Sequence, residues 1–235
     1  MSARALKNPA RNFSTLELPL VTVKAERLVR ISSYESGEPH FGRTASHRFD
    51  DARREYGTSY FGLSLATAVA ESLLHDLEPV GTRYHVAADE VKRRFIHRFD
   101  GKDLALADLT GQSMNILGAH AGLFGTANYS IPMRWSRAIY THPADVDGIL
   151  YVSRMMAPHL AVVLFDRGGS IGLTQRKPSS ALASWRWPRD AYSATDRRAP
   201  PPVPRFWLTV WSLTVYAKAK LALAPVLTDT KLGNL

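Results

Sequence analysis

The chain has 235 residues, of which 45% are hydrophobic, and it carries a formal net charge of +9 at pH 7. This length predicts one substantial hydrophobic core, in a single domain with appended segments. The chain contains no cysteine, which excludes disulfides, zinc–thiolate sites and thiol catalysis.

The first third of the chain is expected to hold an arm, a strand and a long loop. Residues 1–18 are predicted to form an extended arm. Residues 19–30 alternate and include β-branched side chains, which predicts a strand, with Pro19 tolerated at its first position. Residues 32–57 are polar and hold several Gly and Ser, so we expect a long loop. A loop of this length in a compact domain is more often functional than idle.

A short strand that ends at Phe61 leads into an amphipathic helix predicted over 64–77. Ser64 is a suitable N-cap, because its side-chain oxygen can accept from the first free backbone N–H groups. One apolar stripe with helical spacing follows: Leu65, Ala66, Val69, Ala70, Leu73 and Leu74. At about 100° per residue, Glu71 and His75 lie opposite this stripe. These two side chains therefore face either solvent or a cleft.

The rest of the chain mixes short strands with a few helices. Paired strands are expected over 83–88 and 93–99, further strands over 104–109, 149–153 and 160–165, and a helix over 133–140. The segments 207–216 and 221–226 are candidates for the last strands. Because no regular βαβ alternation is present, the pattern favours the α+β class.

Much of the positive charge lies in one segment, 176–205. It holds seven basic residues against two acidic ones, together with six prolines. This composition predicts an irregular, partly extended insertion rather than a folded basic face. A nucleic-acid surface is therefore not indicated, although a protein that binds nucleic acid or a partner through this segment stays an alternative.

Neither export nor membrane insertion is predicted. Residues 1–13 are basic but lack the apolar core of a signal peptide. The longest apolar stretch, 206–217, falls short of the roughly 20 residues that cross a bilayer. We expect a soluble protein located in the cytoplasm.

Common catalytic motifs are weak or absent. Residues 168–172 match G-x-S-x-G after a strand, but the following residues form a poor helix and no Gly-rich oxyanion loop lies upstream. The eight histidines are scattered without metal-ligand spacing, so no metal site is predicted. There is no P-loop and no G-x-G-x-x-G, which argues against a Rossmann cradle for a dinucleotide.

The ordered set Arg30, Arg48, Tyr60, Glu71 and Ser153 resembles the RES-domain family, which is named for its arginine, glutamate and serine. The similar pieces stand in the family's order and spacing: RLVRIS at 27–32, RFDD at 48–51, the segment 56–76, and DGILYVSR with LFDR between 147 and 167. Arg43 competes with Arg48, since the family often shows Gly-Arg here. We prefer Arg48, because RFDD keeps its distance to Tyr60.

The resemblance implies a toxin of a bacterial toxin–antitoxin pair, with a fold related to ADP-ribosyltransferases. Such proteins destroy NAD or transfer its ADP-ribose, so NAD would be a substrate and no cofactor is expected. The resemblance also implies a helix-turn-helix antitoxin as partner, and it leaves homodimerisation open. The catalytic domain would span 19–175, and residues 206–235 would supply strands that complete it beyond the insertion.

The residue types suit this chemistry. Guanidinium forks bind phosphate oxygens, which fits Arg30 and Arg48 to the pyrophosphate of NAD. Glu71 would stabilise the positive charge that develops on the ribose. Tyr60 would cover the nicotinamide ring, and Ser153 would orient the substrate. The acceptor of ADP-ribose could be water, phosphate or a protein, and the last case would make the chain an ADP-ribosyltransferase.

Overall fold

The computed structural model describes residues 5–75, 77–78, 84–168, 171–177 and 179–184. Its strands are β1 (Leu20–Val23), β2 (Val29–Ser32), β3 (Thr58–Gly62), β4 (Phe95–Gly101), β5 (Leu104–Leu109), β6 (Gly148–Val152), β7 (Leu160–Phe165), β8 (Leu173–Gln175) and β9 (Ser180–Ala181). The α-helices are α1 (Leu65–Val69), α2 (Ala88–Lys92), α3 (Gly111–Ile116), α4 (Gly122–Gly125) and α5 (Ser130–Tyr140). A π-helix, η3 (Ala70–Leu74), continues α1, and the 3-10 helices are η1 (Phe13–Thr15), η2 (Ala25–Arg27) and η4 (Leu182–Ser184).

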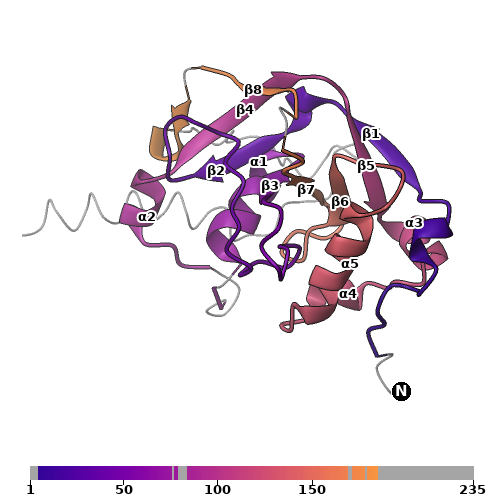
Figure 1. Cartoon of the computed structure of the whole chain (residues 1–235). Coiled ribbons are helices and arrows are strands. Elements are labelled where there is room, and N and C mark those ends of the chain that lie inside the picture. Colours follow the sequence, from indigo (N-terminus) through magenta and orange to yellow (C-terminus); the bar gives the residue numbers. More distant parts are fainter. Residues whose placement is uncertain (1–4, 76, 79–83, 169–170, 178, 185–235) are drawn as a thin grey trace, which may run out of the picture.

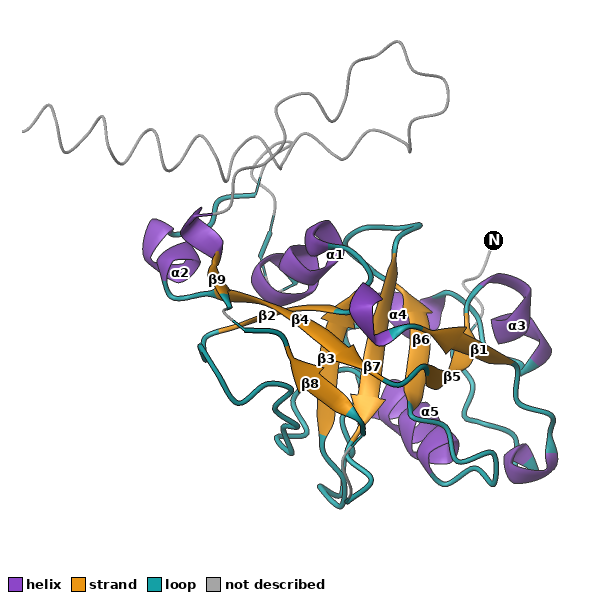
Figure 2. Cartoon of the chain, turned by 90° about the horizontal axis from the view of Figure 1, so that it is seen from above, coloured by secondary structure: helices purple, strands orange, loops and turns teal. Residues whose placement is uncertain are grey.

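The described strands form one mixed sheet in the order β1-β5-β6-β7-β3-β2-β4-β8, and β9 lies beside β4. Strands β5 and β6 are parallel, whereas the other pairs are antiparallel. Helices α2 and α3 lie at opposite ends of the sheet, and α4 and α5 pack together below β6 (Figure 1). Figure 2 shows the same sheet from above. This architecture confirms the predicted α+β class.

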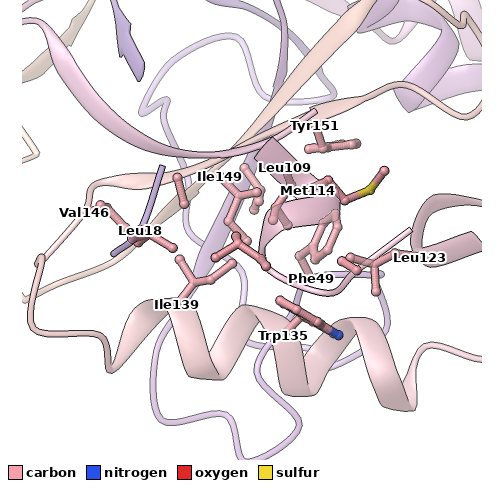
Figure 3. Close-up of a cluster of buried hydrophobic side chains, with 14 of the residues drawn as sticks. Leu18, Phe49, Leu109, Met114, Leu123, Trp135, Ile139, Val146, Ile149 and Tyr151 are labelled. Carbon is pink, nitrogen blue, oxygen red and sulfur yellow. The ribbon is translucent and has the colours of Figure 1, made fainter. Parts of the chain in front are cut away.

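The largest core cluster lies between α5 and the middle of the sheet (Figure 3). Trp135 and Ile139 of α5 are buried against Ile149 and its neighbours on β6. Alternation along β7 explains why this strand is apolar throughout: Val163 belongs to this cluster, while Val162 faces a second cluster on the other side of the sheet. The sheet is therefore covered by apolar side chains on both faces at β7.

The predicted apolar stripe packs as expected. The residues of α1 and η3 that form it contact Val29 and Ile31 of β2 and Ile96 of β4. Gly62, at the end of β3, permits this approach, because a Cβ there would lie 2.3 Å from the backbone nitrogen of Ala68. The structure thus seats the start of the helical segment directly on the sheet.

Strands β2 and β3 pair at only one position, Val29 with Gly62. By contrast, β2 pairs with β4 at four positions, from Val29 to Ser32. Beyond the single pair with β3, a side chain bridges the two strands: Arg30 Nη1 donates to the backbone oxygen of Tyr60 over 3.0 Å. The sheet therefore opens between β2 and β3, and the site described below lies at this opening.

Two predicted elements were wrong. The strand expected over 19–30 is two strands, β1 and β2, separated by the 3-10 turn η2, and they pair with different neighbours. The strand expected over 83–88 is absent from its described part, 84–88. Residues 84–87 are irregular and α2 begins at Ala88. Acidic residues in the first turn of α2 and Lys92 in its last turn favour the helix through its dipole.

Other segments differ in detail from expectation. The helix expected over 64–77 changes from α to π geometry at Ala70. The segment before β1 docks on α5, since Phe13 is buried with its ring 5.4 Å from that of Trp135. Beyond residue 175, the described part contributes β9 and η4, whereas 185–235, which includes the two candidate strands, lies outside the described residues.

Within the described residues, no helix has the length and apolar character required to cross a membrane.

Candidate active site

A cavity of about 410 Å³ opens where β2 and β3 separate. Its walls come from β2, the loop that follows it, β3, η3, α4 and the end of β6. Four of the five residues singled out from the sequence line it: Arg30, Arg48, Tyr60 and Glu71. Its size lies in the range of small-molecule sites, roughly 300–1,000 Å³. The structure thus brings these residues together from parts of the chain that are far apart.

Glu71 projects into this cavity from η3. Ser64 caps the preceding helix as predicted, because its oxygen accepts from the backbone nitrogen of Thr67 over 3.1 Å. Both carboxylate oxygens of Glu71 accept hydrogen bonds from β6 and the residue after it. Tyr151 Oη donates to Oε2 over 3.0 Å, and Ser153 Oγ donates to Oε1 over 2.5 Å. Two hydroxyl donors therefore fix the orientation of the carboxylate.

Tyr151 keeps its proton in this arrangement. Burial raises the pKa of Tyr151 well above its ordinary value, and the neighbouring negative charge of Glu71 raises this pKa further. The phenol therefore stays a neutral donor to the carboxylate at physiological pH.

Ser153 lies behind Glu71 rather than at the cavity surface. Its side chain is fully buried, and the residue does not contribute to the cavity wall. Its hydroxyl is occupied by the bond to Oε1. In this geometry Ser153 contacts the carboxylate, and the expected direct contact between Ser153 and a substrate has no support.

Arg30 is held in place by a buried carboxylate. Its Nε donates to Glu38 Oε2 over 2.7 Å, and its Nη1 donates to the backbone oxygen of Tyr60. Burial alone would raise the pKa of Glu38, but the Arg30 charge and hydrogen bonds outweigh burial and lower this pKa below its ordinary value. Within the described residues Nη2 of Arg30 has no hydrogen-bond partner, so this group remains for a ligand in the cavity.

Arg48 reaches the cavity from the long loop. Its Nη1 donates to the backbone oxygens of Leu123 and Thr126, over 3.2 and 2.8 Å, and its guanidinium lies 4.7 Å from the ring centre of Tyr129. Arg43, the competing arginine, lies outside the cavity. It is half exposed and pairs with Asp166 over 2.8 Å.

The RFDD motif around Arg48 builds this part of the loop. Phe49 is fully buried in the main core, while Asp51 pairs with Arg137 of α5. Asp50 is 2% exposed, and its carboxylate gathers donors from both the loop and β3. Those donors are Thr44 Oγ1, the backbone nitrogens of Ser46 and His47, Thr58 Oγ1 and Tyr60 Oη. The three residues that follow Arg48 therefore anchor this part of the loop and with it the backbone of Arg48.

Tyr60 is anchored through its hydroxyl. This oxygen donates to Asp50 Oδ1 over 3.1 Å and accepts from the backbone nitrogen of Phe49 over 2.9 Å. Burial raises the pKa of Tyr60 well above its ordinary value, and the charge of Asp50 adds to this effect. Because the hydroxyl is fully used, only the ring of Tyr60 is available to a molecule in the cavity.

Sequence reasoning missed the second donor to Glu71. Tyr151 stands two residues before Ser153, so alternation along β6 places both side chains on the same face of the sheet. That spacing could have identified Tyr151. Glu38 and Tyr129 lie in loops without periodic pattern, and no signal in the sequence indicated them. Residues 169–170 of the G-x-S-x-G motif lie outside the described residues.

Comparisons with known proteins concern the family and the fold of this chain. The model of the RES domain matches residues 24–190. A search of curated proteins found no significant match. Among solved structures, a chain of the M. tuberculosis MbcT–MbcA toxin–antitoxin complex is similar, with a TM-score of 0.50 and 16% sequence identity. The similarity covers 64% of this chain and 80% of that chain, and at this identity it concerns the fold.

Proposed function

Because the chain belongs to the RES domain family, we propose that it is a toxin that degrades NAD by cleaving the bond between nicotinamide and ribose. Water or phosphate would accept the ADP-ribose. The observation that carries this proposal is the Glu71 carboxylate, which two hydroxyls orient in a cavity that also holds the guanidinium groups of Arg30 and Arg48.

The reaction needs little more than a positioned carboxylate. When the bond between ribose C1′ and the nicotinamide nitrogen breaks, its electron pair moves to the nitrogen and neutralises the pyridinium ring. Nicotinamide therefore leaves without a proton from a general acid. The ribose carries the developing positive charge, and Glu71 stabilises that charge before an oxygen of the acceptor bonds to C1′. When the acceptor is water, the new C1′–oxygen bond releases one proton to solvent.

Each neighbour has a role consistent with its contacts. Arg30 binds phosphate oxygens through Nη2, and Arg48 binds them through Nε and Nη2. The ring of Tyr60 forms the wall against which nicotinamide packs. Ser153 and Tyr151 act through Glu71, because both donate to its carboxylate.

The proposal also includes a protein partner and an alternative reaction. A structural neighbour comes from a toxin–antitoxin complex, so we expect this chain to bind a protein antitoxin, for which a helix-turn-helix protein is our candidate. The family also leads us to expect that the fold is related to that of ADP-ribosyltransferases, and that the chain could form a homodimer. Transfer of ADP-ribose to a protein is the alternative reaction, since it shares the first bond cleavage.

The test compares wild type with Glu71→Gln. Purified wild type should release nicotinamide from NAD, and Glu71→Gln should lose this activity while circular dichroism and thermal unfolding stay unchanged. Glu17→Gln is the matched control, because Glu17 is exposed and lies outside the cavity. Unchanged turnover by Glu71→Gln would reject the assignment. Mass spectrometry of proteins incubated with labelled NAD distinguishes hydrolysis or phosphorolysis from transfer to a protein.

A further inference from the structure

Arg154 presents an uncommitted guanidinium group to the same cavity. It is exposed, it lines the cavity, and it follows Ser153 directly in the chain. Among the described residues it has no ion-pair or hydrogen-bond partner. Arg30 and Arg48, by contrast, already donate to protein oxygens. The position just after Ser153 places Arg154 beside the segment that holds Glu71.

Arg154 also lies near Arg48. Burial is the main cause that lowers the pKa of Arg48, and the positive charge of Arg154 lowers it further. Two guanidinium groups that face one cavity repel each other, and an anion bound between them removes this repulsion. Phosphate fits this place, because a guanidinium donates to two of its oxygens at once.

We propose that Arg154 and Arg48 together form a phosphate-binding subsite beside Glu71, with Arg154 as its open, ligand-contacting member. The assignment of a phosphate of the reaction to this subsite rests on the proposed function. Two sources share this chemistry. One is the pyrophosphate of NAD, which is attached to the ribose that Glu71 faces, and the other is a free phosphate ion that accepts ADP-ribose.

Binding of inorganic pyrophosphate tests the subsite without requiring any activity. Isothermal titration calorimetry at low salt should show affinity at least about 10-fold weaker in Arg154→Gln than in wild type, the size of effect expected for charge-assisted hydrogen bonds. Arg154→Lys should bind with intermediate affinity, because lysine keeps the charge but loses the fork. Arg134→Gln is the matched control. Arg134 is exposed on α5, contacts Asn8 and does not line the cavity. Equal pyrophosphate affinity in wild type and Arg154→Gln would overturn the subsite.

Kinetics then identify the source of the phosphate. In phosphate-free buffer, a rise of at least about 10-fold in the KM for NAD of Arg154→Gln assigns the subsite to the pyrophosphate of the substrate. The other outcome has two parts: the KM of Arg154→Gln for NAD is unchanged, and added phosphate no longer increases its rate as it does in wild type. That outcome assigns the subsite to the phosphate acceptor. If neither quantity changes, the subsite has no part in the reaction and the assignment fails. Absence of nicotinamide release by wild type would instead reject the proposed function, and the pyrophosphate titration would still decide the subsite.

Discussion

Tyr151 of β6 donates a hydrogen bond to Glu71, which precedes it by 80 residues, over 3.0 Å. Helix geometry alone leaves a glutamate side chain free to rotate, so the direction of this carboxylate is set by a strand rather than by its own helix. The bond from Ser153 to the other oxygen completes the arrangement. The carboxylate is therefore preorganised, which is what stabilisation of a developing charge requires.

Replacing Tyr151 with phenylalanine should lower kcat for NAD cleavage by about fivefold with little change in KM. The reason is the loss of one hydrogen bond, worth about 1 kcal/mol, that orients the reacting carboxylate without touching substrate. Steady-state measurement of nicotinamide release checks this. Tyr56→Phe is the control, since Tyr56 loses a buried contact with Ser136 outside the cavity and should keep its kcat. An unaltered kcat in Tyr151→Phe would show that Ser153 alone orients Glu71.

Replacing Asp50 with asparagine should destabilise the fold. The buried carboxylate of Asp50 accepts from donors on the loop and on β3, and an amide cannot accept from donors on both sides. We expect a loss of about 1.5–3 kcal/mol in the free energy of unfolding, measured by denaturant titration. Asp100→Asn is the comparison, because Asp100 is exposed and pairs with Arg176 at the surface, where little stability is lost. Equal stability of Asp50→Asn and wild type would mean that the loop is held by other contacts.

Acid should weaken the fold partly through Glu38. Its pKa in the folded protein lies below the ordinary value of 4.5, mainly because the Arg30 charge and hydrogen bonds overcome the opposing effect of burial. A lowered folded pKa means that the ion pair contributes its full stability above about pH 4.5 and loses it as pH falls through the folded value.

Glu38→Gln removes that dependence. The free energy of unfolding of the variant should be lower than that of wild type at pH 7, and the two should converge as the solution is acidified below about pH 4.5. Urea titrations across this range measure the difference. His97 is buried, and burial lowers its pKa, while the charge of Glu38 opposes this effect. This histidine therefore adds an acid-dependent loss that is larger in Glu38→Gln than in wild type while Glu38 is ionised. A constant gap between the two curves at all pH values would contradict the assignment to Glu38.

Part of the cavity could be predicted because its residues carry local signals. Ser64 caps a helix whose apolar face is regular, which placed Glu71 on the opposite side, and the resemblance to the RES-domain family singled Glu71 out. The structure resolves the open alternative for this residue in favour of a cleft. RFDD indicated Arg48 through its distance to Tyr60, and the cavity contains Arg48 and not Arg43. The sequence indicated these residues through local signals, although contacts with distant segments fix their side chains in the cavity.

The remaining features depend on contacts between distant segments. Whether Ser153 meets a substrate or Glu71 depends on how β6 packs against η3, and periodicity cannot show that. The segment 83–88 was wrongly predicted as a strand because β-prone residues precede Ala88, whereas the charges that follow favour a short helix. Glu38 is buried only because its loop folds back onto Arg30. The positions of Ser153 and Glu38 therefore follow from contacts that only the folded chain makes.

The opening of the sheet between β2 and β3 has a consequence for protein synthesis. The cavity takes residues from Arg30 on β2 through to Met155 beyond β6. Strand β7, which ends at Phe165, lies between β3 and β6 and pairs with both. The ribosome synthesises these segments in order from the N-terminus. A nascent chain that stops before β7 therefore has Arg30 and Glu71 but no assembled pocket around them. Translation can thus proceed through most of the domain before the growing polypeptide has a complete cavity.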